Sequence, residues 1–368
     1  MLAAGEVSRR AGAEVRLKAE NLQRSGSFKI RGAEYKLGRL SDEELRHGVV
    51  AASAGNHAQA VSLAARRRGA RADLFMPAHA PLAKVEAVRA YGGRVTLVDG
   101  SYHEAAAAAL EHTERTGATL IHPFDDADVL AGQGTIGLEI AAQAPATKLI
   151  VVAVGGGALA AGTAIAARAR LAGVRVVGVQ AESRVRGTIC DGIAVKRPGE
   201  LTAPLLARDL DRIVTVSDDE VAEAMVLLLE RSKLVVEGAG AASVAAILAQ
   251  KIELGEGDEV CAVLSGGNVD ATRLVECIRL GETAAGRRLV FSTVVRDRPG
   301  ELAHLIACVA EAGANVLDVT HIREGVDLHV RETVIRLVLQ VDGREHGRRI
   351  LAAVAERGFA TRLEERVR

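Results

Sequence analysis

The chain of 368 residues is longer than one typical domain, which indicates two or more units that each bury a core. Its 47 basic and 47 acidic side chains balance without a long block of one sign, so nucleic acid is not an expected partner. Hydrophobic residues make up 49% of the chain and aromatic residues only 2%, so Ala, Val, Leu and Ile must build the core. Such a composition is typical of alternating helices and buried parallel strands.

The four cysteines form no CxxC pair and follow no secretory leader, which argues against a disulfide framework or a zinc site. We therefore expect reduced thiols and a cytoplasmic location. The most apolar run, 149–167, is about long enough to span a bilayer, but it contains three consecutive glycines and lacks flanking anchors. We interpret it as a strand, a glycine turn and a helix, and expect no membrane partner.

The first half of the chain alternates short apolar runs with helical patterns. Residues 15–19 alternate apolar and charged side chains, as a half-buried strand does, and Ser41–Glu44 has the form of a capping box that opens a short helix. The patterns that follow predict strands at 49–52, 73–76, 94–98 and 119–121, with helices near 56–68, 82–91 and 102–115.

The same rhythm continues to residue 264, which is typical of a doubly wound α/β sheet. We expect residues 1–286 to form the domain that contains this sheet, with a small subdomain at about 48–125. The remaining strands predicted in this domain are 148–154, 175–179, 213–216 and 259–264. The remaining helices are 158–171, a helix that starts at a capping box at 217–220 and ends at 229, and a helix after 240.

The pattern breaks at 282–288, so we place a domain boundary after Gly286. Residues 287–368 predict the order βαββαβ of a ferredoxin-like unit. Its expected elements are strand 289–295, a helix ending at 312, strands 315–322 and 332–341, helix 344–357 and a strand near 359–363.

Lys29 is the first candidate for chemistry, because it stands between Phe28 and Ile30 where a loop turns into a helix. Burying an ammonium is costly unless it is neutralised, paired or used covalently. The alternative is a surface lysine whose stem lies along its two apolar neighbours.

Gly155, Gly156 and Gly157 follow an apolar strand and precede a helix, so their amides could approach a phosphate at the positive end of that helix. A dinucleotide fingerprint is matched only loosely, with Gln180 and Glu182 as weak candidates for the ribose carboxylate. A tight turn that needs glycine is the structural alternative.

Two further clusters follow predicted strands. In the cluster 53–57, Asn56 could cap a helix or bind a ligand through its amide, and His57 is interpreted as a helix-start histidine without a catalytic role. In the cluster 265–268, glycines would let the backbone approach a flat ligand, and the Ser265 hydroxyl could bond to a ring nitrogen.

These motifs occur in one order along nearly the whole chain, and they closely resemble those of the pyridoxal-phosphate enzymes of the tryptophan-synthase β fold, or fold type II, specifically the threonine dehydratases (threonine ammonia-lyases). The motifs are 25–29, 53–57, 132–135, 155–157 and 265–268. The resemblance implies two parallel-sheet subdomains and pyridoxal 5′-phosphate as cofactor. It also implies β-elimination of L-threonine, and of L-serine, to 2-oxobutanoate or pyruvate and ammonia.

By this resemblance Lys29 carries the Schiff base and acts as general base, Asn56 meets the ring hydroxyl and Ser265 the pyridine nitrogen. A neutral hydroxyl there does not enforce ring protonation, which favours elimination over transamination. The implied cofactor-binding residues are Phe28, Asn56, Gly155, Gly156, Gly157, Ala158, Ser265 and Gly266, and the implied substrate-binding residues are Ser53, Ala54, Gly55 and His57.

Two details refine the resemblance. Related racemases place a serine hydroxyl at the position of Ala54, and a methyl group cannot donate a proton, so Ala54 favours elimination over racemisation. Relatives that bind a monovalent or divalent cation hold it near the loop after residue 183, which makes Glu182 the candidate ligand.

The terminal unit resembles an ACT domain, a small-molecule regulatory module. The resemblance implies Asp297 to Gly300 as the turn that faces the ligand, Asn315 as the start of the second strand, and an apolar amino acid such as isoleucine or valine as effector. ACT units usually pair edge to edge, which implies a homodimer or homotetramer.

The alternatives left open are a serine racemase or other β-eliminating lyase, a non-catalytic amino-acid sensor, and a nicotinamide oxidoreductase. Cofactor content separates the sensor from the pyridoxal-phosphate enzymes, and absence of NAD binding would exclude the oxidoreductase.

Overall fold

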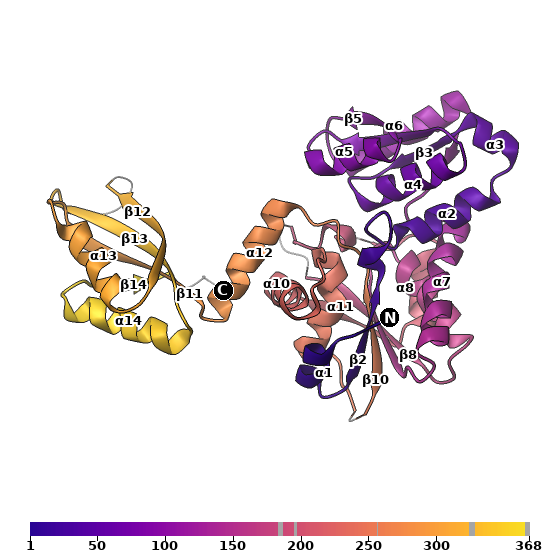
Figure 1. Ribbon diagram of the computed structural model, residues 1–368. Coiled ribbons are helices and arrows are strands. Elements are labelled where there is room, and N and C mark those ends of the chain that lie inside the picture. The colour runs from indigo at the N-terminus through magenta and orange to yellow at the C-terminus, as the bar shows by residue number, and fades with distance from the viewer. Residues whose placement is uncertain (183–186, 195–196, 256, 324–327, 365–368) are drawn as a thin grey trace. The chain divides into compact units, whose positions relative to one another are not determined.

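The computed structural model describes residues 1–182, 187–194, 197–255, 257–323 and 328–364 (Figure 1). The chain forms two compact units, Met1–Leu274 and Val275–Arg368. Their division falls inside helix α12 (Ala271–Ala284), ahead of the boundary proposed after residue 286. Each unit is described by itself below.

The larger sheet of the first unit has six strands in the order β1-β2-β10-β7-β8-β9. Every neighbouring pair is parallel except β1 with β2. Its central strand β7 is buried along its whole length, which explains the continuous apolar run in the sequence. The bounds are β1 Leu2–Ala3, β2 Glu14–Ala19, β10 Glu259–Leu264, β7 Leu149–Ala153, β8 Arg175–Ala181 and β9 Arg212–Val216.

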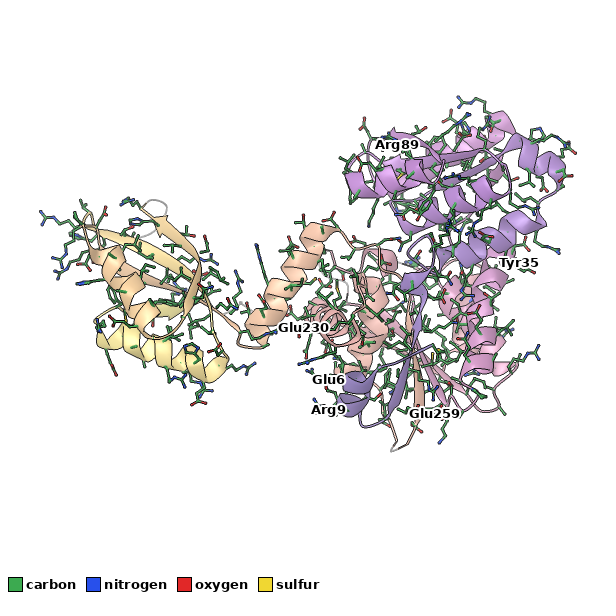
Figure 2. The ribbon with its side chains drawn as sticks, in the orientation of Figure 1. Glu6, Arg9, Tyr35, Arg89, Glu230 and Glu259 are labelled. Atoms are coloured by element: carbon green, nitrogen blue, oxygen red, sulfur yellow. The ribbon has the colours of Figure 1, made fainter. Side chains whose placement is uncertain are left out.

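Helices cover this sheet, and their outer faces carry charged side chains such as Glu6 and Arg9, which form an exposed ion pair of 2.7 Å on α1 (Figure 2). Exposed pairs of this kind contribute little to stability. The helical elements are α1 Gly5–Ala11, η1 Glu20–Leu22, α7 Ala127–Gln143, α8 Ala158–Arg168, η2 Asp191–Ile193, α9 Thr202–Asp209, α10 Asp218–Leu227, the π-helix η3 Leu228–Ser232 and α11 Gly238–Leu248.

The smaller sheet has four parallel strands in the order β5-β4-β3-β6. The predicted capping box at Ser41 and Glu44 is present and starts α3. The strands are β3 Val49–Ala52, β4 Ala72–Pro77, β5 Arg94–Val98 and β6 Thr119–Leu120, and the helices are α2 Lys29–Arg39, α3 Asp42–His47, α4 Asn56–Arg67, α5 Leu82–Ala90 and α6 Tyr102–Thr116. The prediction of two parallel sheets with helices is therefore confirmed.

The second unit has the predicted βαββαβ order, folded as one antiparallel sheet β12-β13-β11-β14. Its core is built around Phe291, Leu305, Ile335 and Ile350, all fully buried. The elements are β11 Arg288–Arg296, α13 Glu301–Glu311, β12 Asn315–Ile322, β13 Glu332–Gln340, α14 Arg344–Glu356 and β14 Thr361–Leu363.

Helices α7, α9 and α12 are not among the elements predicted from the sequence. In α7 the glycines of the 132–135 motif obscure the helical pattern, and the structure shows what they do. A Cβ on Gly132 would lie 2.6 Å from the Arg31 carbonyl oxygen, and one on Gly137 would lie 2.4 Å from that of Thr163. These glycines let α7 contact its neighbours α2 and α8 closely. Within the described residues no helix is long and apolar enough to cross a membrane.

Candidate active site

Lys29 is the first residue of α2, a helix whose N-cap residue Phe28 offers no side-chain cap. Its Nζ donates a hydrogen bond of 2.6 Å to the carbonyl of Pro123 and lies 5.1 Å from the centre of the Phe28 ring. Burial lowers the pKa of this amine to about 8, although the Glu237 carboxylate opposes the shift. A substantial fraction of Lys29 is therefore neutral at mildly alkaline pH.

The loop before Lys29 is joined by backbone contacts to the segment after β10. Ser27 and Gly266 form an antiparallel bridge. The Phe28 N–H donates to the Ser265 carbonyl at 3.0 Å, and the Gly267 N–H donates to the Gly26 carbonyl at 2.8 Å. Ser265, the residue expected at a ring nitrogen, is thus held directly beside the lysine loop.

Asn56 lies at the centre of a polar chain. Its Nδ2 donates to Glu237 Oε1 at 2.7 Å, and its Oδ1 accepts from Asn268 Nδ2 at 2.7 Å. Asn268 also donates to the Ser25 carbonyl at 2.8 Å, so four segments of the chain meet here. Burial raises the pKa of Glu237, while the ammonium of Lys84 and the hydrogen bond from Asn56 act in the opposite direction.

The glycine loop leads from β7 into the N-terminus of α8. Among the described residues, the backbone N–H groups of Gly155, Gly156, Gly157 and Ala158 have no acceptor. Gly157 has a φ of +100°, and a Cβ on Gly156 would lie 2.1 Å from the Phe124 ring, so neither position accepts a side chain. Free N–H groups at the positive end of a helix of 11 residues suit an anion such as a phosphate.

The 53–57 loop forms the N-terminus of α4 at the end of β3. Ser53 Oγ accepts from the Gly55 N–H at 3.1 Å, and Ala54 is exposed. His57 is buried with its Nε2 2.7 Å from the Ile121 carbonyl oxygen, and burial lowers its pKa to about 3. A neutral imidazole bonded to the backbone fastens the loop, which agrees with the interpretation that His57 has no catalytic role.

The structure therefore brings together Lys29, Asn56 and Ser265 through direct hydrogen bonds between their segments. Glu182 lies elsewhere, just after β8, where its N–H donates to the Val216 carbonyl. In the described ranges no group of three His, Cys, Asp or Glu side chains could hold a metal ion. Residues 183–186 of the expected cation loop lie outside the described residues.

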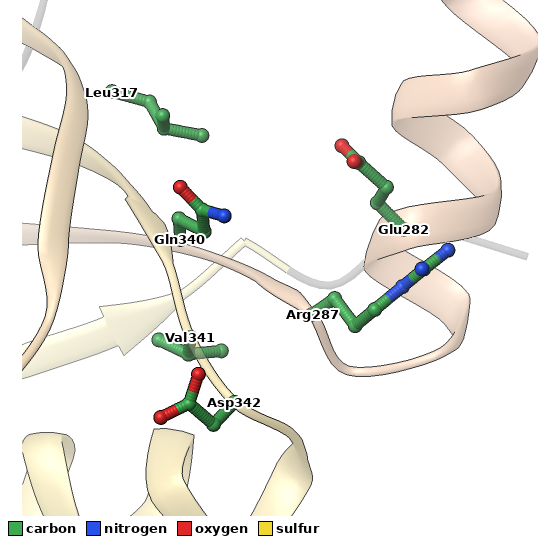
Figure 3. A pocket seen from close by; sticks show the side chains of 6 residues that line it. All are labelled: Glu282, Arg287, Leu317, Gln340, Val341 and Asp342. Atoms are coloured by element: carbon green, nitrogen blue, oxygen red, sulfur yellow. The ribbon is translucent and has the colours of Figure 1, made fainter.

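The three expected regulatory residues of the second unit do not form one cluster. Asp297 is paired with Arg323 at 3.2 Å and lines a cavity of about 380 Å³ together with Gly300. Asn315 begins β12, and the far end of this strand reaches the cavity at His321. The Asn315 side chain donates to Gln340 Oε1 at 3.3 Å. Gln340 lines a different groove, of about 490 Å³, with Glu282 and Leu317 (Figure 3).

Glu237 and Pro123 were missed by reasoning from the sequence. Glu237 did leave a signal, a single acid between an apolar run and the glycine-rich start of α11. Pro123 left none, because it contributes only a carbonyl oxygen. Asn268 was noted as part of its motif, but its contact with Asn56 joins residues far apart in the chain.

The family model described as "Pyridoxal-phosphate dependent enzyme" matches residues 1–266. The chain belongs to the pyridoxal-phosphate dependent enzymes. It is 44% identical to the L-threonine ammonia-lyase of Thermotoga maritima, over 96% of this chain and 91% of that protein.

Solved structures of pyridoxal-phosphate dependent enzymes superpose on most of the chain. The processed threonine deaminase isoform 2 of Solanum lycopersicum has a TM-score of 0.71 at 35% identity, over 76% of this chain and 82% of that one. Maize serine racemase has a TM-score of 0.71 at 34% identity, over 75% and 89%. The free N–H groups of the glycine loop and the low-pKa amine of Lys29 fit the phosphate and the aldehyde of this family's cofactor.

The pKa of Lys29 predicts how the cofactor-free chain captures pyridoxal phosphate. Only the neutral amine attacks an aldehyde, so the rate should rise about tenfold per pH unit below pH 8 and level off above it. Stopped-flow absorbance at several pH values measures this rate. Nα-acetyl-lysine is the control for ionisations of the aldehyde itself. A ratio of protein to control rate that shows no break near pH 8 contradicts the lowered pKa.

Proposed function

We propose that this protein is a pyridoxal-phosphate-dependent threonine ammonia-lyase, which converts L-threonine to 2-oxobutanoate and ammonia, and L-serine to pyruvate and ammonia. The observation that supports this most strongly is the low-pKa amine of Lys29, fixed beside the segment of Ser265 in a chain that spans 91% of a threonine ammonia-lyase relative. The chain contains every cofactor-binding residue that the resemblance implies, which argues against a non-catalytic sensor.

Each site residue has a part in this proposal. When bound, the cofactor supplies an electron sink for the substrate α-carbon. The N–H groups of Gly155, Gly156, Gly157 and Ala158 would hold its phosphate, Phe28 and Gly266 would contribute to its site, and Ser265 would offer the ring nitrogen a neutral hydroxyl. Such a partner does not enforce protonation of the ring nitrogen, which favours elimination over transamination.

The reaction follows from a neutral amine beside a carboxylate-binding helix end. Lys29 Nζ accepts the proton from the substrate α-carbon and returns it to the β-hydroxyl, which leaves as water. The released enamine takes up water and loses ammonia. The N–H groups of Ala54, Asn56 and His57, which have no acceptor among the described residues, bind the substrate carboxylate at the start of α4, beside Ser53 and Gly55.

Lys29→Ala should abolish conversion of threonine to 2-oxobutanoate, by at least about a thousandfold, because the base and covalent anchor are one group. Borohydride reduction of the wild-type protein should fix the cofactor to the peptide that contains Lys29, as mass spectrometry would show. Lys36→Ala is the matched control, because Lys36 of α2 is paired with Asp126 and Asp128. This variant should still convert threonine and should still trap the cofactor on Lys29. Trapping on another lysine refutes the assignment, and a protein without cofactor points to a sensor.

Serine racemisation is the second candidate, favoured by the likeness to maize serine racemase. Racemisation needs a proton donor on the cofactor face opposite Lys29, and the exposed methyl group of Ala54 cannot be one. Wild-type protein should therefore form little D-serine. Ala54→Ser should raise the ratio of D-serine to pyruvate by about tenfold or more, and Ala54→Gly should not. Equal ratios in all three proteins, measured by chiral chromatography, contradict this role of Ala54.

We also propose that the second unit is an ACT domain that binds an apolar amino acid such as isoleucine or valine. Its βαββαβ order and the cavity at the turn from Asp297 to Gly300 support this. Asn315 lies at the other end of β12, so it belongs to such a site only if a second copy contributes one half. The exposed edge strand β12 suits edge-to-edge pairing into a homodimer or homotetramer. Regulation by isoleucine would suit a cytoplasmic enzyme of isoleucine biosynthesis.

Isoleucine or valine should shift the plot of velocity against threonine concentration, because a second ligand site implies linkage. Asp297→Ala removes the ion pair with Arg323 at the cavity, and it should reduce this shift without changing the velocity measured without effector. Arg336→Ala, which removes an ion pair with Glu364, is the control. Superimposable curves with and without both amino acids would count against regulation.

A further inference from the structure

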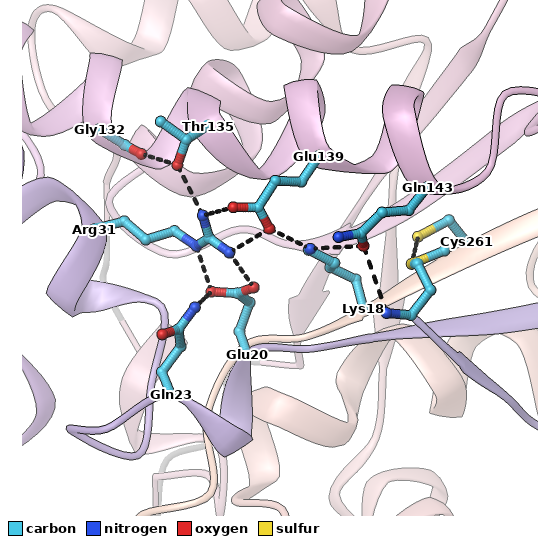
Figure 4. A network of polar contacts seen from close by, with 10 residues as sticks. Lys18, Glu20, Gln23, Arg31, Gly132, Thr135, Glu139, Gln143 and Cys261 are labelled. Atoms are coloured by element: carbon cyan, nitrogen blue, oxygen red, sulfur yellow. Dashed lines mark hydrogen bonds and ion pairs between the residues drawn. The ribbon is translucent and has the colours of Figure 1, made fainter.

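Arg31 lies two residues after Lys29 on α2 and is the centre of a polar network (Figure 4). Its side chain is only 12% exposed. The guanidinium uses all of its five N–H donors. The bonds are Nε to Glu20 Oε2 at 2.6 Å, Nη2 to Glu20 Oε1 at 2.9 Å, Nη1 to Thr135 Oγ1 at 3.0 Å, Nη1 to Glu139 Oε1 at 2.7 Å and Nη2 to Glu139 Oε2 at 2.8 Å.

The acceptors come from two other elements, so the guanidinium joins α2 to η1 and to α7. Glu139 also pairs with Lys18 of β2, a buried lysine whose Nζ donates to Gln143 at 3.1 Å. The positive charges of Arg31 and Lys18 are thus balanced by the carboxylates of Glu20 and Glu139. Burying charges in this way is a poor source of stability, because apolar side chains of similar volume stabilise a core as well or better. What a directional network adds is a fixed geometry.

The Pro123 carbonyl and the bridge between Ser27 and Gly266 locate the first turn of α2 on one side, and the Arg31 network holds the other side. The helix has no side-chain cap at its N-terminus. Its contact with α7 is made by glycines: a Cβ on Gly32 would lie 2.8 Å from the Val129 carbonyl oxygen, and one on Gly132 would lie 2.6 Å from Gly32 Cα. The glycines bring the two helices close together, and Arg31 and Lys36 are polar side chains of α2 that bind the α7 segment beside them.

Residues two apart on a helix point about 200° from each other. Arg31 therefore faces away from the side of α2 on which Lys29 reaches Pro123. We propose that Arg31 is a positioning residue for Lys29, which fixes the rotation and axial position of the first turn of α2 so that the amine stays buried in reach of the reacting atoms. This inference rests on the proposed role of Lys29.

The test is Arg31→Lys, which keeps the charge but loses the forked hydrogen bonds. In the full-length protein loaded with cofactor, kcat for threonine should fall about tenfold or more, while KM changes less than about threefold. In the full-length cofactor-free chain, reaction of Lys29 with an acylating reagent should show its half-maximal rate at a pH at least half a unit higher than in wild type. Peptide mass spectrometry follows Lys29 alone.

Arg67→Lys is the matched control, because Arg67 also binds α2, through Glu34, but in an exposed pair. It should change neither measurement. Glu139→Gln removes one arm of the network at a half-exposed residue and should give intermediate effects, so the test does not depend on one variant folding.

A lowered melting temperature of Arg31→Lys with unchanged kcat and an unchanged Lys29 profile would show a merely structural role and overturn the proposal. A proposed function that is itself wrong gives a different result. Wild-type protein would then not convert threonine, or Lys29→Ala would convert it as fast as wild type, whatever the labelling profile of Lys29.

Discussion

The free energy of desolvating one amine is the constraint on which the site depends. In its proposed role as nucleophile and base Lys29 must lose its proton, and burial is what lowers its pKa to about 8. Burial in turn depends on where α2 begins, since Lys29 is its first residue. The Pro123 carbonyl and the bridge between Ser27 and Gly266 locate that first turn from one side, and the Arg31 network locates it from the other.

Parallel strands explain why the remaining groups converge. β3, β7 and β10 end in the three loops that carry Asn56, the glycine turn and Ser265. The first two loops also begin helices, so they present N–H groups that the helices themselves leave without acceptors. The fold thus supplies two helix N-termini that suit anions, and these are the ones proposed above for the cofactor phosphate and for the substrate carboxylate.

Most of this was predictable from local patterns. The strands were predictable because buried parallel strands appear in the sequence as apolar runs. The site loops were predictable because their glycines follow those runs. Helix α7 was not, since its glycines serve contacts with α2 and α8 that exist only in three dimensions. The same holds for the partnership of Asn56 with Glu237, which joins residues 181 positions apart. Asn315 shows the converse, since a correct strand assignment placed it at the wrong end of the sheet for the Asp297 turn.

Binding an amino acid next to a neutral amine poses an electrostatic problem that these helix ends solve. A substrate carboxylate near Lys29 favours the protonated amine and so opposes its role as base. A cationic side chain offsets this charge, and Lys84 lies here, because its Nζ is 3.5 Å from the position that a Cβ on Gly55, the N-cap residue of α4, would take. Backbone N–H dipoles at the start of α4 offset the negative charge without carrying a titratable proton. His57, whose pKa is lowered to about 3, likewise adds no charge to the first turn of that helix. In the proposed mechanism the α-proton passes to Lys29, the amine whose pKa burial lowers to about 8.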